Sequence, residues 1–344
     1  MKDLEALLRQ RIVYFDGGIG TSFQKMKLEE ENFRGSLFKD HPVSLKGNND
    51  LLSLTDPETV KKMHRAFVEA GSDIISTNTF SATRVSQADY QMEDQAYDIN
   101  KQSALLAREV ANEAKDRYVF VAGSIGPTTK ITSLSPDVSN PAYRDISFDD
   151  LSKAFEEQVE ALMDGGVDLL LAETFIDTLN IKACISAWER VFAKRGVRLP
   201  VILSATITDK SGRTLSGQTI EAFWNSVRHA KPLAVGLNCA FGAKELKPYI
   251  REISELADCY VSCYPNAGLP NPLSDTGYDE TPEHTGKALL DMVNEGYVNM
   301  VGGCCGTTPQ HICKIIEMTK DQRPRTLVSP QKKMRLSGFE PMNI

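Results

Sequence analysis

The stretch Gly166-Val167-Asp168-Leu169-Leu170-Leu171-Ala172-Glu173 connects a helical pattern to a short apolar run that stops at a carboxylate. Gly71-Ser72-Asp73-Ile74-Ile75 is a weaker copy of its first five residues. Nearly continuous apolar runs are typical of strands buried on both faces, and strands that alternate with helices indicate a parallel sheet. The chain therefore has the pattern of repeated βα units.

Along the whole chain, eight such apolar runs, this one included, each precede a helical pattern. The predicted strands cover residues 11–15, 73–77, 119–124, 167–172, 201–205, 235–239, 260–263 and 298–301. Eight βα units in one chain predict an α/β fold of the (β/α)8 TIM-barrel type, with a doubly wound sheet as the alternative. Helix boundaries agree, because Asp56-Pro57, Thr281-Pro282 and Thr308-Pro309 each place a capping residue before a proline.

Two connections are long: residues 25–50 follow the first predicted strand and residues 126–146 follow the third. Both belong to the C-terminal end of the predicted barrel, where long loops usually form the wall of an active site, although plain surface insertions are the alternative. From about Gln322 the chain is rich in proline, serine and basic residues. We predict a barrel over residues 1–320 and a linker over residues 321–344.

Composition excludes several classes of protein. The 344 residues are 41% hydrophobic, enough for a large core. Neither a secretory signal nor an apolar run of about 20 residues is found, so we expect a cytoplasmic protein without a membrane span. A net charge of −7 argues against a nucleic-acid partner. Seven cysteines, an odd number, favour reduced thiols or metal ligands over a disulfide framework.

Three cysteines are placed to bind one metal. Gly302-Gly303-Cys304-Cys305-Gly306-Thr307 follows the eighth predicted strand, and Cys239 ends the sixth. These strands are near neighbours around a barrel, so we expect the thiols to meet. Three thiolates from distant segments leave the fourth position of Zn²⁺ open, as in catalytic sites. The alternatives are core thiols or a disulfide between Cys304 and Cys305. The remaining cysteines, which lie in apolar segments, are predicted to be core residues: Cys184, Cys259, Cys263 and Cys313.

Other predicted strands also end in polar residues. Asp16-Gly17-Gly18 follows the first, Glu173-Thr174 the fourth and Pro265-Asn266-Ala267-Gly268 the seventh. Asp16 could instead cap the turn after its strand. The glycines after it do not form a dinucleotide-binding loop, because Phe23 stands where the third glycine would be required. The helical histidines, which we do not predict as ligands, are His64, His229 and His311.

Four motifs together resemble the zinc-dependent homocysteine S-methyltransferases, a TIM-barrel family, over roughly residues 8–320. They are Asp16-Gly17-Gly18, Glu173-Thr174-Phe175, Gly236-Leu237-Asn238-Cys239 and Gly302-Gly303-Cys304-Cys305-Gly306. Within that family, Lys46-Gly47-Asn48-Asn49-Asp50-Leu51-Leu52 and the run at 135–144 look like the homocysteine-binding module of cobalamin-dependent methionine synthases. Leu336-Ser337-Gly338-Phe339-Glu340-Pro341 is similar to the linker that precedes their folate-binding module.

The resemblance implies a methyltransferase of methionine biosynthesis. Its substrate would be L-homocysteine, and its methyl donor would be methylcobalamin, recharged from methyltetrahydrofolate. The cobalamin-binding and folate-binding modules, the implied partners, would belong to the same full-length protein and are absent from this chain. The alternatives are a stand-alone methyltransferase that uses betaine or S-methylmethionine, and a non-enzymatic barrel with a structural zinc.

The resemblance also assigns residues. Zn²⁺ would be bound by Cys239, Cys304 and Cys305, with the Asn266 carbonyl as fourth ligand before the substrate arrives. Asp16 and Glu173 would accept hydrogen bonds from the substrate ammonium. The backbone of Gly17 and the hydroxyl of Thr77 are candidate donors to the substrate carboxylate, because a glycine turn leaves its amides uncrowded.

Overall fold

Eight parallel strands form a barrel. The computed structural model describes residues 3–273, 277–329 and 332–344. The strand order is β1-β8-β7-β6-β5-β4-β3-β2. The barrel closes where Phe15 and Ile74 form a parallel bridge and the amide of Asp73 donates to the carbonyl of Tyr14 at 2.8 Å. The predicted (β/α)8 fold is confirmed. The strands are β1 (Val13–Tyr14), β2 (Ile74–Ser76), β3 (Phe120–Ile125), β4 (Leu169–Phe175), β5 (Val201–Ala205), β6 (Ala234–Asn238), β7 (Tyr260–Tyr264) and β8 (Met300–Val301).

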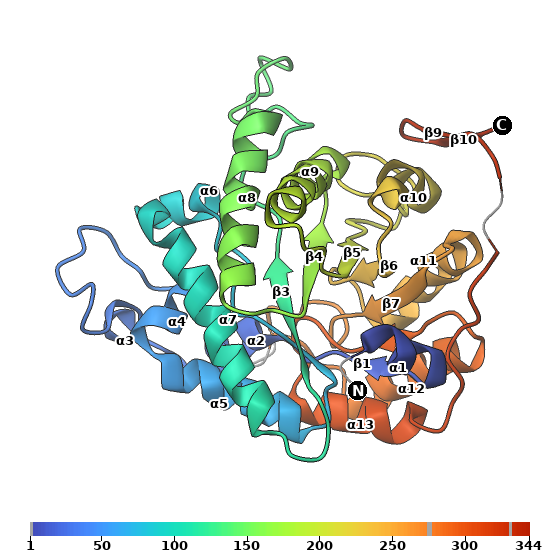
Figure 1. The fold of residues 1–344 in the computed structure, drawn as a ribbon, viewed down its shortest axis with the longest axis horizontal. Helices are drawn as coiled ribbons and strands as arrows, with labels where there is room; N and C mark the ends of the chain where they lie inside the picture. Colours follow the sequence, from blue (N-terminus) through green and yellow to red (C-terminus); the bar gives the residue numbers. More distant parts are fainter. Residues whose placement is uncertain (1–2, 274–276, 330–331) are drawn as a thin grey trace.

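Helices surround the strands, as Figure 1 shows. They are α1 (Leu4–Gln10), α2 (Ile19–Lys25), α3 (Glu30–Arg34), α4 (Leu52–Thr55), α5 (Pro57–Glu69), α6 (Arg84–Gln87), α7 (Ala96–Glu113), α8 (Phe148–Asp164), α9 (Thr178–Arg195), α10 (Ile220–Val227), α11 (Ala243–Leu256), α12 (Pro282–Asn294) and α13 (Pro309–Thr319). The predicted starts of α5, α12 and α13 are confirmed, since Asp56, Thr281 and Thr308 cap them. In each case the hydroxyl or carboxylate of the capping residue accepts a hydrogen bond from a backbone amide of the first turn that would otherwise be unpaired.

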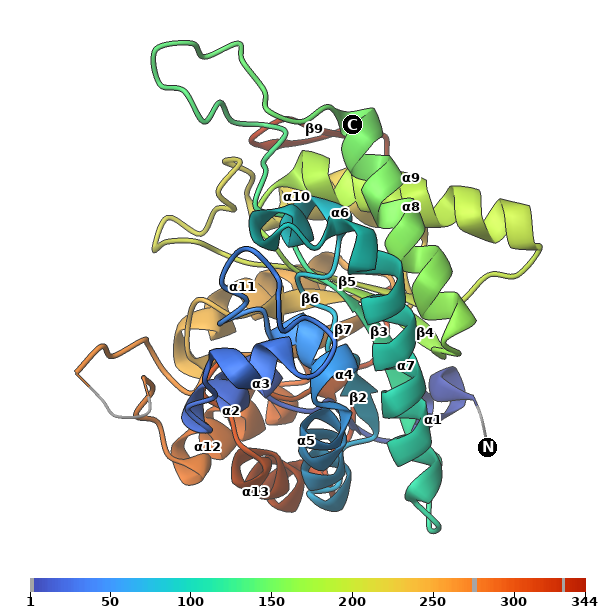
Figure 2. The same cartoon turned by 90° about the vertical axis from the view of Figure 1, so that its left-hand side faces the viewer.

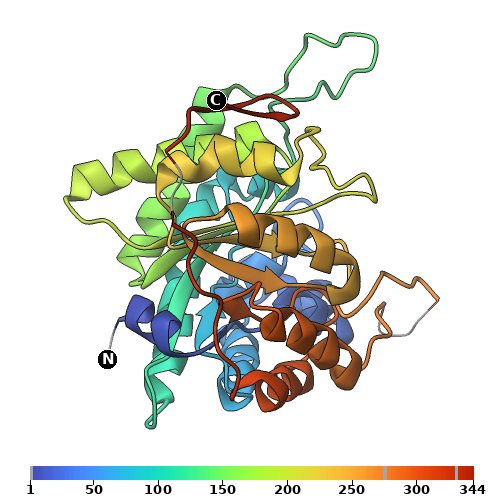
Figure 3. The ribbon, with the colours of Figure 1, turned by 90° about the vertical axis from the view of Figure 1, so that its right-hand side faces the viewer.

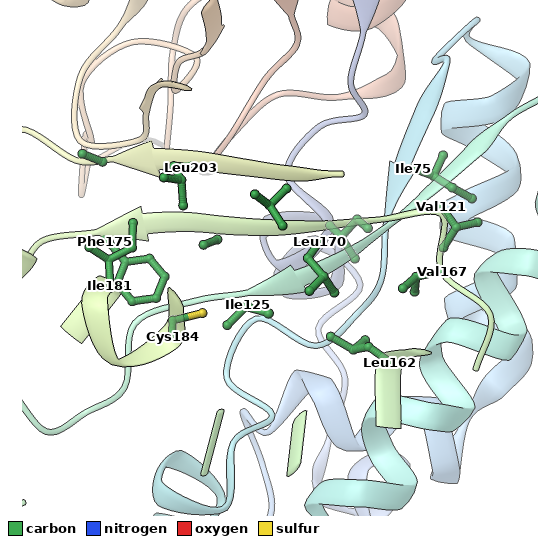
Figure 4. Packing of buried hydrophobic residues seen from close by; sticks show 14 of the residues in the cluster. Ile75, Val121, Ile125, Leu162, Val167, Leu170, Phe175, Ile181, Cys184 and Leu203 are labelled. Atoms are coloured by element: carbon green, nitrogen blue, oxygen red, sulfur yellow. The ribbon is translucent and has the colours of Figure 1, made fainter. Parts of the chain in front are cut away.

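The core has two layers. Inside the barrel, alternate residues of the strands, such as Phe15 and Leu171, pack together, and Leu4 and Leu8 of α1 join this inner cluster. Between strands and helices lies a larger cluster, part of which Figure 4 shows around Leu170, Phe175 and Leu162. Each strand packs against one layer on each of its two faces, so residues on both faces are apolar. This is why each strand appears in the sequence as a nearly continuous apolar run.

The four cysteines predicted to be core residues divide into three groups. Cys184 and Cys263 are buried, as predicted, and Cys184 packs against β4 in Figure 4. Cys259 is partly buried. The prediction for Cys313 is wrong, because this residue is exposed. The buried positions of α13 are 311, 312, 315 and 319, and position 313 faces away from them.

Long loops leave the barrel on one side. In Figures 2 and 3 the loop after β3, the loop after β5 and the described part of the loop after β7 all project toward the same side. This is the C-terminal end of the strands, as predicted. Residues 126–147 contain no helix or strand, whereas the segment at 25–50 includes the short helix α3. Val138, in the first of these loops, is 96% exposed.

The described end of the tail forms regular structure, which the sequence did not predict. Strands β9 (Arg335–Ser337) and β10 (Pro341–Asn343) form an antiparallel hairpin on α10. The hydroxyl of Ser337 donates to the carbonyl of Ala222 at 2.6 Å, and the amide group of Asn343 donates to Glu221 at 2.6 Å. The role of residues 321–344 as a linker stays a prediction. Within the described residues, no helix has the length and apolar character needed to cross a membrane.

Candidate active site

A cavity of about 370 Å³ opens at the C-terminal ends of the strands. Both predicted loops contribute to its wall, through residues 47–50 and Thr129. Its other lining residues are 15–21, 76–81, Ser86, Asp89, Tyr90, Ser124, Leu171, Glu173, Thr174, Cys239, Tyr264 and 303–305. In a TIM barrel the active site lies at this end, because the strand ends point their side chains into one space.

Cys239, Cys304 and Cys305 meet in this cavity, as predicted. Their sulfur atoms all lie within 4.8 Å of one another, and the Sγ atoms of Cys239 and Cys305 are 3.9 Å apart. Sulfur ligands at about 2.3 Å from a tetrahedral zinc ion are separated by about 3.8 Å, so the triad has the spacing that zinc requires. All three thiols are free, which excludes the disulfide between Cys304 and Cys305.

Hydrogen bonds to neighbouring strand ends hold the cysteine loop. The amide of Cys304 donates to the carbonyl of Pro265 at 2.7 Å, and the amide of Gly303 donates to the carbonyl of Asp16 at 3.1 Å. Cys239 has φ +63°, a left-handed conformation that is uncommon for a residue with a side chain. Strain of this kind is concentrated at functional sites, where surrounding contacts enforce it.

Asn266 lies beside the triad. Its side chain is 1% exposed, and its Oδ1 accepts a hydrogen bond from the amide of Cys305 at 3.1 Å. One lone pair of the predicted fourth ligand is thus used to position a cysteine. Its role as a metal ligand stays a prediction.

Asp16 is a buried carboxylate at the end of β1. It accepts hydrogen bonds from the amide of Ser76 at 2.7 Å and from the hydroxyl of Ser76 at 3.1 Å. Burial raises the pKa of Asp16 to about 7 despite these bonds, and the nearby charge of Glu173 adds to the effect. A carboxylate in this state gains strongly from an incoming cation.

Glu173 is a residue of β4 and lies near Asp16. Its carboxylate accepts from the hydroxyl of Ser124 at 2.5 Å, and burial raises its pKa to about 7. The register of β4 against β5 shifts between Ala172 and Phe175, and Thr174 has φ +61°. The Asn238 side chain holds Thr174 in this conformation through bonds of 3.0 Å and 2.7 Å. The β-bulge sets the direction of Glu173 at the cavity wall.

The two predicted donors to the substrate carboxylate differ. Gly17 lines the cavity, and a Cβ atom there would lie 2.8 Å from Phe67 and from Thr307, so only glycine fits. The hydroxyl of Thr77 contacts that of Thr79 at 2.6 Å. Since Thr79 donates its own proton to the carbonyl of Ser124, the Thr77 proton is directed to Thr79. Both roles stay predictions.

Several lining residues were not predicted. Ser76 and Ser124 support the two carboxylates, and their signal in the sequence is a hydroxyl within an otherwise apolar strand. Asp50 is 6% exposed, and burial raises its pKa to about 7. It lies in the run at 46–52, which we noted only for its resemblance. Among the described residues that line the cavity, none is lysine, arginine or histidine.

Comparison with known proteins agrees with this geometry. The family model described as homocysteine S-methyltransferase matches residues 13–319, and the chain belongs to this family. Its members transfer a methyl group to homocysteine. The fold is similar to that of the homocysteine methyltransferase MmuM from Escherichia coli. Its oxidized form has a TM-score of 0.69 at 20% identity and covers 93% of this chain and 100% of that chain. The metallated form has a TM-score of 0.68 at 22% identity, and the match covers 92% of this chain and 99% of that chain.

Proposed function

We propose that this barrel binds L-homocysteine and activates its sulfur for methyl transfer from methylcobalamin, giving methionine. The observation that carries the proposal is the arrangement of three cysteine sulfurs and two buried carboxylates in one open cavity. Family membership supports the substrate and the reaction class. A structural zinc would need no substrate-sized cavity beside it, so the non-enzymatic alternative is disfavoured.

Cys239, Cys304 and Cys305 would hold the zinc ion. When bound, zinc keeps the substrate sulfur as a thiolate, whereas a free thiol with a pKa of about 8.5 is only a few per cent ionised at neutral pH. Three thiolates leave one position of a tetrahedral site for that sulfur. Asn266 would occupy this position until the substrate arrives.

The carboxylates would orient the amino acid group. Asp16 and Glu173 face the same space, and each would accept a hydrogen bond from the substrate ammonium. The cavity offers no cationic side chain from its described lining to the substrate carboxylate. That group would therefore rely on uncharged donors, for which the amide of Gly17 is the first candidate. The hydroxyl of Thr77 could donate to it only after its proton turned away from Thr79. Such an arrangement favours amino acid thiols over simple thiols.

The loops on the active-site side of the barrel support a large, protein-borne methyl donor. Exposed apolar side chains stand on the three projecting loops: Val138 is 96% exposed, Leu215 43% and Leu273 94%. Exposed apolar side chains on loops at this end of a barrel are available for contact with a partner. We propose that the cobalamin-binding module of the same protein docks here, and that residues 321–344 lead toward its folate-binding module.

One observation favours a second candidate, a stand-alone methyltransferase. The cavity is lined by four acidic residues, Asp16, Asp50, Asp89 and Glu173, and by no basic residue from the described chain. An anionic cavity attracts a cationic methyl donor, such as the sulfonium of S-methylmethionine or the quaternary ammonium of betaine. Methylcobalamin needs no such charge.

A donor assay separates the candidates. The zinc-loaded chain is incubated with homocysteine and with methylcobalamin, S-methylmethionine or betaine, and methionine is quantified by mass spectrometry. We expect methionine from methylcobalamin alone. Formation from either cationic donor would establish the second candidate. X-ray absorption at the zinc edge tests the common step, since homocysteine should add one sulfur to the coordination sphere. An unchanged sphere would contradict both candidates.

A further inference from the structure

Asn238 connects the two halves of the candidate site, the cysteine triad and the carboxylates. It is the last residue of β6 and is fully buried. Its Oδ1 accepts hydrogen bonds from the amide of Thr174 at 3.0 Å and from the hydroxyl of Ser204 at 2.6 Å. Its Nδ2 donates to the hydroxyl of Thr174 at 2.7 Å and to the sulfur of Cys304 at 3.7 Å. The side chain thus contacts β4, β5 and the loop after β8.

These bonds leave the side-chain amide of Asn238 one orientation. Such an amide can accept twice through its oxygen and donate twice through its nitrogen, and all four positions are filled. The backbone amide of Thr174 can only donate, so the oxygen must face it. A buried amide that turned away from these partners would leave polar groups unpaired in the interior, which is unfavourable. Asn238 is therefore a rigid part of the barrel.

The partners of Asn238 lead to the two groups that a substrate would bridge. On one side, Thr174 directly follows Glu173, and its φ of +61° belongs to the β-bulge that sets the direction of Glu173. On the other side, Cys304 is a proposed zinc ligand, and the main chain of Asn238 continues into a second one, Cys239. One buried side chain thus fixes the carboxylate relative to the sulfur atoms.

We infer that Asn238 determines which length of amino acid thiol the site accepts. The inference rests on the proposed function, in which Glu173 binds the ammonium and zinc binds the sulfur of the same molecule. Homocysteine has one more methylene group than the free amino acid cysteine. A rigid separation of the two binding groups lets homocysteine reach both, whereas the shorter cysteine reaches only one at a time. Asn238 is not among the described residues that line the cavity, so it acts through Thr174 and Cys304 as a positioning residue.

The test compares three thiols on the zinc-loaded protein by calorimetry: homocysteine, free cysteine and 1-propanethiol, which has no amino acid group. We expect the parent to bind homocysteine about tenfold more tightly than cysteine, since cysteine loses one charge-assisted contact. Thr174→Val removes the hydroxyl to which Asn238 donates but keeps a β-branched side chain. The Glu173 carboxylate is then free to follow a shorter substrate, so the preference for homocysteine over cysteine should fall roughly threefold or more.

A second variant and a matched control complete the comparison. Ser204→Ala removes the bond from β5 without changing the described cavity wall, so it should lower the preference in the same direction even if Thr174→Val does not fold. Thr206→Val is the control, because the Thr206 hydroxyl donates to the backbone carbonyl of Asn238 at 2.9 Å and not to its side chain. Its preference should equal that of the parent. A merely structural defect would weaken all three thiols alike and leave the preference unchanged.

Zinc content is measured after each titration, and X-ray absorption at the zinc edge is recorded with homocysteine. A parent whose zinc gains no sulfur from homocysteine would refute the proposed function, and the inference with it. If the zinc of the parent gains that sulfur, an unchanged preference in the variants or an equal fall in the control would overturn the inference alone. Loss of zinc from both variants would also overturn it, because the contacts of Asn238 would then serve metal binding and not substrate length.

Discussion

Cys239 shows at the scale of one residue how the barrel builds a metal site. It follows directly after β6 and turns with a positive φ, so its sulfur reaches the Cys304–Cys305 loop at the end of β8. We predict that Cys239→Ala, Cys304→Ala and Cys305→Ala each lose stoichiometric zinc yet stay folded, because a core of this size does not need the metal. Zinc is measured by atomic emission and folding by circular dichroism. Cys313→Ala, at an exposed position, is the control that keeps zinc. Full zinc in all three variants would contradict the site.

The two carboxylates should affect recognition and leave the metal unchanged. Asp16→Asn and Glu173→Gln keep shape but remove the charge that would pair with the substrate ammonium. A charge-assisted hydrogen bond is worth roughly 1.5–3 kcal/mol, so homocysteine affinity should fall by about one to two powers of ten. Calorimetry on the zinc-loaded variants measures this. A thiol without the amino acid group should bind both variants and the parent equally. Loss of zinc in either variant would show that the carboxylate belongs to the metal site.

Asp16 also makes stability depend on pH. Its pKa rises from 3.8 in the unfolded chain to about 7 in the fold. The folded protein therefore binds the proton more tightly, and stability that is fully present below about pH 4 is lost as the pH rises through about 7. We predict that the free energy of unfolding of the metal-free protein falls between pH 5 and pH 8. Asp16→Asn should reduce the fall by on the order of 2–4 kcal/mol. Urea unfolding at both pH values measures it, and an equal fall in parent and variant would contradict the prediction.

Among the elements, α1 closes the N-terminal end of the barrel. Leu8 is fully buried in the inner cluster, far along the strands from the cysteines. Leu8→Ala should destabilise the protein by about 2–5 kcal/mol, because it leaves a cavity that rigid strands cannot fill. Urea unfolding gives the value. Zinc content and homocysteine affinity of the folded variant should match the parent, and a loss of either would mean that the inner cluster transmits strain to the site.

Much of this element structure could be predicted from sequence. Strands buried on both faces produce unbroken apolar runs, and proline after a capping residue marks a helix start, so β4 and α5 were placed within a few residues. Helix α1 was not predicted, because it is short and its role is to plug the barrel. The hairpin β9–β10 was also missed, since its stability comes from bonds to α10 that no local pattern reveals.

The candidate site was predicted unevenly for a similar reason. The cysteines and carboxylates stand at strand ends, and barrel topology alone brings strand ends together. Asp50 lies in the long segment after β1, and its position depends on contacts such as the hydrogen bond that its carboxylate accepts from the amide of Ser81 at 3.4 Å. The β-bulge at Thr174 is set by Asn238, which is distant in sequence. A pattern within one segment carries no information on such partners.

At the scale of the whole molecule, we predict that the projecting loop at 126–147 acts in methyl delivery and not in substrate binding. Replacing residues 134–143 by a short glycine-serine linker should lower methyl transfer from methylcobalamin at least tenfold, because exposed side chains such as Val138 would no longer contact the donor-carrying module. Homocysteine affinity and zinc content should stay as in the parent. Methionine formation and calorimetry measure the two effects. Unchanged transfer would remove this loop from the docking surface.

Barrel closure places the first and last strands side by side. β1 pairs with β8, the amide of Gly303 donates to Asp16, and the amide of Gly18 donates to Thr307 at 3.2 Å. The site is thus made from the first and the last strand of the barrel, which gives its assembly an order in time. During synthesis Asp16 emerges well before Cys304 and Cys305. All three sulfurs that could capture a metal are therefore present only after the last strand of the barrel has been made, so metal capture would follow the completion of the barrel.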